Sequence, residues 1–166
     1  MRKLPAIALA LVAAALVSAC GKSEPPVMPS SAPVAAETPA PAATPPTADQ
    51  LKRVAALPAP YNTGDPARGE EKFALCHTCH LSAKGAPNLT GPDLWGVFGT
   101  KAAQVPGFDF SDGLKKSGLT YDAPTLDKWI TDPRVLVPDT KMTFAGVKDP
   151  KDRIDIIAYL ATQRDP

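Results

Sequence analysis

Residues 76 to 80 read Cys-His-Thr-Cys-His, and this pentapeptide constrains the chain more than any other feature. Two thiols three positions apart can each add across one of the two vinyl groups of a haem, and the histidine that follows can reach the iron. The only other cysteine is Cys20. The motif therefore predicts one covalently attached haem c, held by Cys76 and Cys79, with His80 as an iron ligand.

Three other uses of this spacing agree less well with the rest of the chain. A thioredoxin-like redox pair follows a strand in a βαβ unit, and no such pattern precedes Cys76. A zinc site takes four ligands, but the two cysteines and two histidines that follow residue 60 are packed into five positions. A disulfide across two residues would be strained and would leave His80 without a role.

The remaining sulfur and imidazole groups narrow the choice of a second axial ligand. His77 lies between the two cysteines, on the side of the macrocycle that the proximal ligand already occupies. Met1 belongs to the leader and Met28 to a proline-rich segment, which leaves Met142. Methionine often fills gaps in a core. Met142, however, stands in the polar stretch from Pro138 to Phe144, so we predict that it is the sixth ligand of the iron.

The N-terminus has the pattern of an export signal. Arg2 and Lys3 precede an apolar run from Leu4 to Ala19, which is too short to span a bilayer as a helix. The run ends in Val17-Ser18-Ala19-Cys20, which resembles the lipobox of bacterial lipoproteins, where the cysteine becomes the lipid-modified first residue. Residues 1–19 are therefore predicted to be a signal peptide. An ordinary cleavage site and an uncleaved anchor are the alternatives.

The segment that follows has the composition of a tether. Between Gly21 and Pro60, ten of 40 residues are Pro and ten are Ala, and none is aromatic. Such a chain buries too little apolar surface to fold and favours extended geometry. Thr47 to Leu57 has helical spacing, but a helix there would be marginal in isolation. We predict a lipid-anchor cysteine and tether over residues 20–60, and a monohaem domain over residues 61–166, which contain all ten aromatic residues.

Helix signals predict an all-α domain of three to five helices around the haem. Asp65 with Pro66 opens a helix that leads to the two cysteines, and Asp149 with Pro150 opens the last helix. Asp122 is expected to cap a helix that ends at Asp132. One apolar face is expected on the last helix, made of Ile154, Ile156, Ile157, Leu160 and Ala161. No alternating strand pattern is present, and residues 81–119 are expected to be loop.

Several segments between Gly64 and Leu160 together resemble the mitochondrial-type class I cytochromes c, including bacterial members of that group. They follow the family's order and spacing: Gly69 with Phe73, the haem motif, Thr90-Gly91-Pro92-Asp93-Leu94, Pro106-Gly107-Phe108, Thr140-Lys141-Met142 and Ala158-Tyr159-Leu160. The resemblance implies haem thioethers at Cys76 and Cys79 and axial ligands at His80 and Met142.

The resemblance also implies roles for residues around the haem. The Pro92 carbonyl would accept a hydrogen bond from the His80 ring, and Gly69 would let the first helix of the family fold approach the last. Tyr121 and Trp129 are expected to contact the cofactor; Trp129 stands where the family has a tyrosine near the methionine sulfur.

Four positions depart from the family around the haem propionates. The family usually has Arg, Tyr, Asn and Trp where this chain has Thr100, Phe110, Leu114 and Tyr121. Loss of polar groups near a buried carboxylate favours its protonation or exposure. We therefore hypothesise that the rear propionate is less shielded than in typical relatives.

An iron with both axial positions filled binds no small-molecule substrate, so the expected function is one-electron transfer rather than catalysis. The resemblance implies a cytochrome bc complex as donor and a haem-copper oxidase or photosynthetic reaction centre as acceptor. The expected location is the periplasmic side of the bacterial cytoplasmic membrane, with the N-terminal anchor in the membrane. A fixed electron-relay subunit of a larger complex is one alternative, and an open-site haem peroxidase or gas sensor is another.

The charge of the chain argues against one class of partner and departs from the charge pattern of the family. The net charge of +1 argues against nucleic-acid binding. Residues 61–166 carry 13 basic and 14 acidic side chains, so the lysine ring through which family members dock is thinned. Arg134, Lys141 and Lys148 would keep positive charge near the haem edge, although each is equally consistent with an ordinary surface charge.

Overall fold

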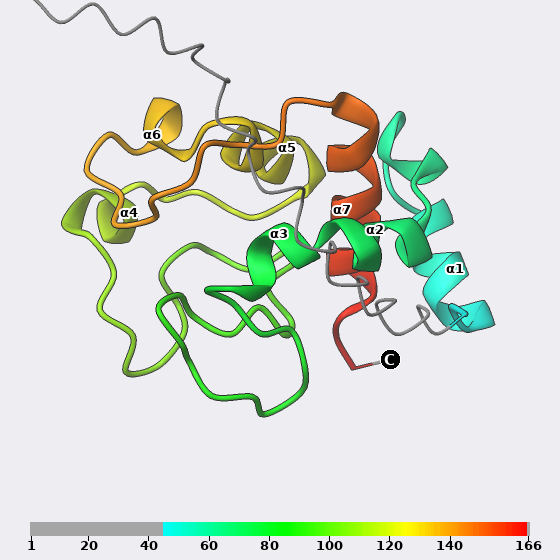
Figure 1. Cartoon of the computed structure of the whole chain (residues 1–166), viewed down its shortest axis with the longest axis horizontal. Helices are drawn as coiled ribbons and strands as arrows, with labels where there is room; N and C mark the ends of the chain where they lie inside the picture. Colours follow the sequence, from blue (N-terminus) through cyan, green and yellow to red (C-terminus); the bar gives the residue numbers. More distant parts are fainter. Residues whose placement is uncertain (1–44, 166) are drawn as a thin grey trace, which may run out of the picture. The chain divides into compact units, whose positions relative to one another are not determined.

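A computed structural model describes residues 45 to 165, which form helices and no β-strand (Figure 1). The leader, the lipobox at Cys20 and the proline-rich segment through Thr44 lie outside the described residues. The helices are α1 (Ala48–Ala55), the 3-10 turn η1 (Tyr61–Thr63), α2 (Pro66–Lys72), α3 (Ala74–His77), α4 (Asp112–Lys116), α5 (Ala123–Thr131), α6 (Pro133–Leu136) and α7 (Pro150–Thr162). The all-α class is confirmed. Four helices are seven residues or longer, and the others are single turns.

Aspartates begin the predicted helices as expected. The Asp65 carboxylate accepts from the backbone N–H groups of Ala67 and Arg68, and Pro66 follows at the first helical position. Asp122 and Asp149 cap α5 and α7 in the same way. Each carboxylate satisfies N–H groups that have no partner inside the helix.

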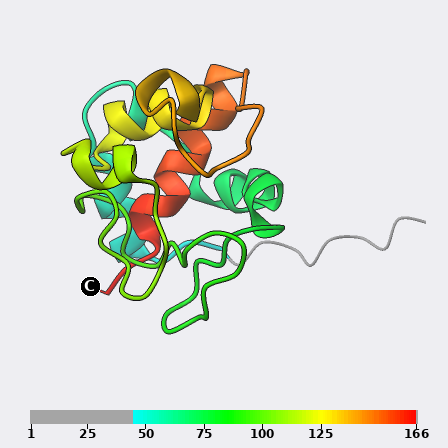
Figure 2. The same ribbon diagram turned by 90° about the vertical axis from the view of Figure 1, so that its left-hand side faces the viewer.

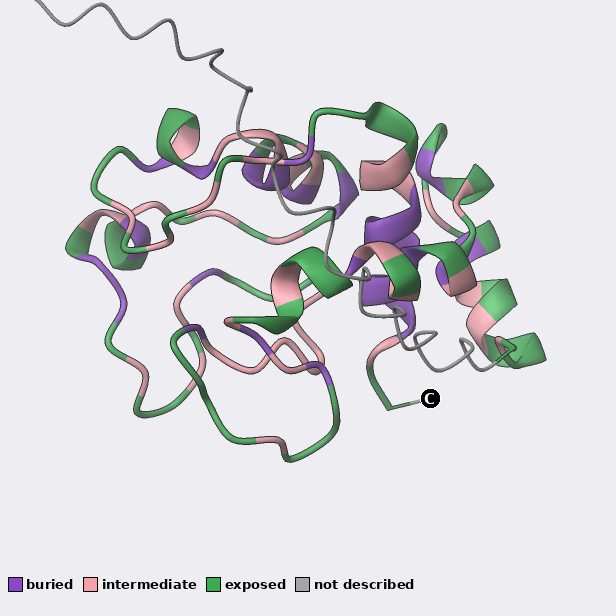
Figure 3. Ribbon diagram, viewed as in Figure 1, coloured by how far each residue is buried: buried purple, intermediate pink, exposed green. Residues whose placement is uncertain are grey.

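The α7 helix runs through the centre of the domain (Figure 2). Its residues from Asp155 to Thr162 are all buried, where a single apolar face was expected (Figure 3). The difference arises because α7 is enclosed on several sides: α1, α2 and α5 all pack on it, while Ile156 and Leu160 line a cavity.

The closest packing is at the crossing of α2 and α7. A Cβ atom on Gly69 would overlap the carbonyl oxygen of Asp155 and lie 2.7 Å from the Cβ of Tyr159. This confirms the expected close approach at Gly69. The fully buried Asp155 carboxylate accepts from the Asp65 N–H at 2.8 Å and pairs with Arg68 at 3.1 Å and Lys151 at 2.5 Å.

The α1 helix lies within the segment expected to be tether. Thr47 and Gln50 form a capping box at its start, and Val54 is buried. It packs against α7 and η1, and this contact supplies the stabilisation that an isolated helix of its length lacks. The folded part of the chain therefore begins before Tyr61.

Two short helices were not expected. Ser111 caps α4 inside the segment expected to be loop, and Asp132, which ends α5, also caps α6. Between residues 45 and 165, no helix has both the length and the apolar character that crossing a bilayer requires.

Candidate haem site

A cavity of about 710 Å³ lies beside α7, within the size range of cofactor sites. The elements that line it come from most of the domain: α3, the loop between α3 and α4, α5, α7 and the segment from Thr140 to Val147. Its deeper wall is apolar, with Phe73, Leu126, Ile130, Ile156 and Leu160. An apolar cavity of this volume fits a porphyrin.

The two cysteines of the motif line the same cavity. Cys76 lies in α3, and Cys79 follows in the turn that ends the helix, where the His80 N–H donates to the Cys76 carbonyl at 2.9 Å. Both side chains are partly buried. Burial, followed by the neighbouring Cys79, raises the pKa of the free Cys76 thiol to about 11, so before a haem is attached the thiol is protonated at neutral pH.

The His80 ring is oriented by the main chain. Its Nδ1 lies 2.7 Å from the Pro92 carbonyl oxygen. Because a carbonyl only accepts, Nδ1 carries the proton and donates. Burial lowers the pKa of His80, so the ring is neutral and its Nε2 keeps a lone pair for a metal. The backbone of Gly91 lies against the ring, because a Cβ there would be 2.6 Å from Nδ1.

Met142 lines the cavity from a loop. Its N–H donates to the Thr140 hydroxyl at 3.2 Å, and the neighbouring Lys141 side chain pairs with Asp109. His77, by contrast, is exposed, does not line the cavity and packs on the edge of Phe73 with ring centroids 4.9 Å apart.

The aromatic residues expected at the cofactor also line the cavity. Tyr121 and Trp129 pack together with ring centroids 6.0 Å apart. Burial raises the pKa of Tyr121 to about 12, which keeps its hydroxyl protonated.

The remaining positions that depart from the family pattern line the cavity as well. Phe110 and Leu114 are buried and present no polar group. The Thr100 hydroxyl donates to the Val97 carbonyl at 2.8 Å. The structure thus brings all four departures, Tyr121 among them, to the wall of one cavity.

Sequence reasoning missed Arg153, which ties the end of the Met142 loop to α5 and α7. Its guanidinium bonds the Asp127 carboxylate at 2.5 Å and donates to the carbonyls of Val147 and Lys148 at 3.1 and 2.9 Å. Asp127 lies 26 residues away in the chain, so no local pattern reveals the contact.

The fold and the site define an all-α protein with a Cys-x-x-Cys-His motif on one apolar cavity, and comparison with known proteins identifies the family. The chain is 50% identical over 103 residues to cytochrome c2 of Rhodomicrobium vannielii, covering 62% of this chain and 82% of that protein. It is 44% identical over 103 residues to cytochrome c of Euglena viridis, covering 61% of this chain and 100% of that protein.

A solved structure gives the same result. Cytochrome cH from Methylobacterium extorquens is 53% identical, with a TM-score of 0.56, over 60% of this chain and 99% of that one. No family model matches the chain. The chain belongs to the class I cytochrome c family. It carries one covalent haem c and is an electron-transfer protein rather than an enzyme.

Proposed function

We propose that the chain carries single electrons between membrane-bound complexes through a haem c ligated by His80 and Met142. The observation that carries this proposal is one apolar cavity lined by His80, Met142 and both cysteines of the motif, with the His80 ring fixed by Pro92. Haem c, when bound, supplies the ferric and ferrous states between which one electron is exchanged.

Each residue of the site has a distinct role in this proposal. Cys76 and Cys79 supply the two thioether links, which hold the cofactor permanently. His80 presents Nε2 to the metal because Nδ1 is occupied by the Pro92 carbonyl. The Met142 thioether is a soft ligand that favours the ferrous state, and it closes the position that a substrate would need.

The cavity wall sets the dielectric around the ferric and ferrous states of the haem iron. Leu126, Ile156 and Leu160 exclude water, and a low dielectric disfavours the extra charge of the ferric state. Tyr121 and Trp129 are proposed to contact the cofactor, and both can donate a hydrogen bond.

The proposed partners follow from the family. We infer a cytochrome bc complex as donor and a haem-copper oxidase or photosynthetic reaction centre as acceptor. The proposed location is the periplasmic side of the cytoplasmic membrane, with lipid attached at Cys20. A tether raises the effective concentration of the carrier near its partners and reduces the need for long-range electrostatic steering.

Two measurements test this function. A pyridine haemochrome assay on the purified full-length protein is expected to give one haem c per chain. The reduced protein should then be oxidised by membranes that contain its oxidase, and the oxidised protein should be reduced by a purified cytochrome bc complex. Failure of both transfers would refute the shuttle. Stable co-purification with one complex after mild detergent extraction would instead support a fixed relay.

The anchor is tested separately. The intact mass of the mature protein reports cleavage before Cys20 and acyl modification together. A mass that corresponds to cleavage without acyl groups would refute the lipid anchor and leave the shuttle standing.

A further inference from the structure

Two buried hydroxyl groups join the segment that carries His80 to α7. The Ser82 Oγ and the Tyr159 hydroxyl oxygen lie 2.9 Å apart, and the two residues are only 5% and 7% exposed. Either hydroxyl can donate to the other. Neither residue lines the haem cavity. A buried hydroxyl that loses its partner costs free energy, so each of these groups holds the other in place.

Ser82 belongs to a pair of main-chain segments, residues 79–82 and 91–94, which we call the histidine clamp. Two main-chain hydrogen bonds join the segments: Gly91 N–H to the Cys79 carbonyl at 2.8 Å and Leu94 N–H to the Leu81 carbonyl at 2.7 Å. The bond from His80 Nδ1 to the Pro92 carbonyl, also 2.7 Å long, falls between these two in the sequence. The clamp therefore holds the acceptor of the His80 ring opposite its donor.

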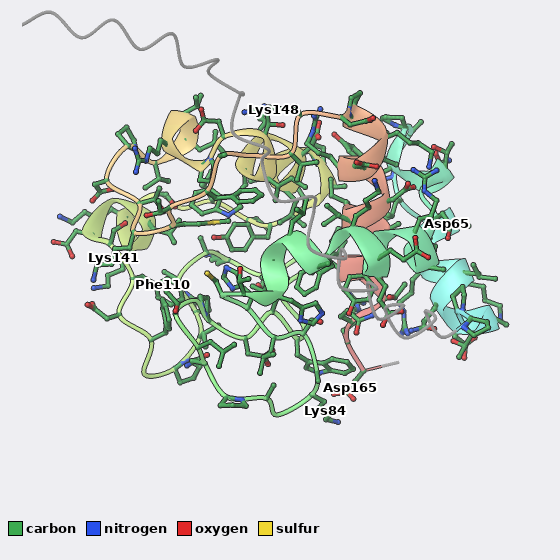
Figure 4. All side chains as sticks on the ribbon, viewed as in Figure 1. Asp65, Lys84, Phe110, Lys141, Lys148 and Asp165 are labelled. Carbon is green, nitrogen blue, oxygen red and sulfur yellow. The ribbon has the colours of Figure 1, made fainter. Side chains whose placement is uncertain are left out.

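In the part of the chain that the structure describes, the bond between Ser82 and Tyr159 is the one buried hydrogen bond that joins residues 79–94 to α7. A second side-chain contact from this stretch, Lys84 with Asp165 at 2.7 Å, lies at the surface beyond the end of α7 (Figure 4). An exposed ion pair of this kind contributes little to stability. Among the polar contacts, the buried hydroxyl pair therefore fixes the clamp on the central helix.

Tyr159 is a rigid point for this contact. Its ring packs on the fully buried Phe73 with ring centroids 5.2 Å apart. Its Cβ lies at the crossing of α2 and α7, where Gly69 makes its close approach. A hydrogen bond to this ring thus holds Ser82 against a part of the fold that cannot move without disturbing the packed core.

We propose that Ser82 and Tyr159 are positioning residues for the haem ligand His80, and that their bond keeps the Pro92 carbonyl at hydrogen-bond distance from the imidazole. This role rests on the proposed function, in which His80 binds the iron through Nε2. In that state His80 is held by the iron and by the neighbouring thioether link at Cys79, whereas Pro92 reaches the ring through the clamp.

The bond from His80 Nδ1 to Pro92 affects how strongly the imidazole donates electrons to a metal. A carbonyl acceptor raises the basicity of the ring, and a more basic ligand favours the ferric state. When the clamp loosens, the Pro92 carbonyl lies farther from the ring on average, so the imidazole donates less and the ferrous state is favoured. The hydroxyl pair thus tunes the midpoint potential without contact with the cofactor.

The test removes one oxygen atom at a time. The full-length, haem-loaded protein is prepared as wild type, as Ser82→Ala, as Tyr159→Phe and as the double variant, in which neither hydroxyl is left without its partner. The control is Thr162→Val, which removes another buried hydroxyl. Thr162 bonds the Tyr159 carbonyl at 2.6 Å within α7 and does not line the haem cavity. Potentiometry measures the midpoint potential, and amide hydrogen exchange at the Leu94 N–H measures opening of the clamp.

The expected results follow from one shared bond. Each single variant should shift the equilibrium between oxidised and reduced protein toward the ferrous state by about threefold. Because each substitution breaks the same bond, the double variant should shift by the same factor and not by the product of the two. Relative to the amides of α7, the Leu94 N–H should exchange about tenfold faster in all three variants. Thr162→Val should keep the wild-type potential, although it also loses a buried hydrogen bond.

Three outcomes overturn this role. Ser82 and Tyr159 variants that lose stability but keep the wild-type potential would make the hydroxyl pair a structural contact with no effect at the haem. Single shifts that multiply in the double variant would show that the two hydroxyls act independently. An equal shift in Thr162→Val would show a general effect of α7.

The proposed function is tested by the wild type alone. A wild type without a reversible one-electron couple refutes the proposed function, and the positioning role with it. A wild type that shows the couple, together with variants of unchanged potential, refutes only the role of the hydroxyl pair.

Discussion

Gly69 of α2 and Asp155 of α7 meet backbone to backbone, with no space for a Cβ atom on the glycine. This contact sets the separation of the two helices, because the obstructing atom is a main-chain carbonyl that cannot rotate away. The same crossing places Ile156 and Leu160 at the haem cavity. The glycine therefore positions the cavity wall as well as the helix pair.

Gly69→Ala is expected to lower the free energy of unfolding by about 2–3 kcal/mol, because the helices must move apart to admit a methyl group. Denaturant unfolding of the haem-loaded protein measures it. The control is Gly85→Ala, where φ is +74° and a Cβ has open space, so only the backbone cost of about 1 kcal/mol applies. Equal losses in the two variants would contradict the helix-contact explanation.

The folded domain is expected to lose stability above pH 10 through Tyr61. Burial, and then the adjacent Asp127 carboxylate, raise the pKa of this phenol above its usual value of 10.0. Below pH 10 the hydroxyl is protonated in both states, and above it the unfolded chain releases its proton first, so stability falls as pH rises. Between pH 9 and 11, the free energy of unfolding should fall less steeply with pH in Tyr61→Phe than in the wild type. An unchanged slope would rule out this group.

The midpoint potential is expected to fall with rising pH in the neutral range. Phe110 and Leu114 present no polar group at the cavity wall, and the Thr100 hydroxyl is bonded to a main-chain carbonyl. A haem propionate that finds few hydrogen-bond donors is disfavoured as the anion, so its pKa rises and it titrates near neutrality. Potentiometry from pH 6 to 8 tests this, and Phe110→Tyr should flatten the curve. A wild-type potential that is already flat would contradict the hypothesis.

Arg153→Gln is expected to weaken Met142 ligation before it unfolds the helices. Arg153 donates hydrogen bonds to the main chain at Val147 and Lys148, so its loss frees the end of the Met142 loop. The loss of these bonds should destabilise that loop by about 1–2 kcal/mol. The red sulfur-to-iron band of the ferric protein should disappear at a lower guanidinium concentration than the helical circular dichroism. Arg134→Gln, at an exposed position, is the control. Coincident midpoints in Arg153→Gln would show a purely global effect.

Local signals in the sequence predicted much of the fold. Asp65, Asp122 and Asp149 begin helices because a cap acts within three residues, and the motif from Cys76 to His80 is itself local. The features that local signals left open or missed depend on contacts between distant segments. The α1 helix forms because it packs on α7, and the buried Asp155 depends on Arg68 and the Asp65 N–H, which lie far away in the chain.

The site shows the same division. The identities of its candidate ligands came from the residue inventory, since few histidines and methionines were available. The contact of His80 with Pro92 was expected only from the family resemblance. The contact of Arg153 with Asp127 was missed, because it joins two helices that no sequence period connects.

The absorption spectrum of the ferric full-length protein at neutral pH tests the proposed ligand pair most directly. With His80 and Met142 both on the iron, the weak red sulfur-to-iron band is present in the wild type and lost in Met142→Ala, while one haem c per chain remains in both. A wild-type spectrum without that band, or a band that survives in Met142→Ala, would contradict the assignment.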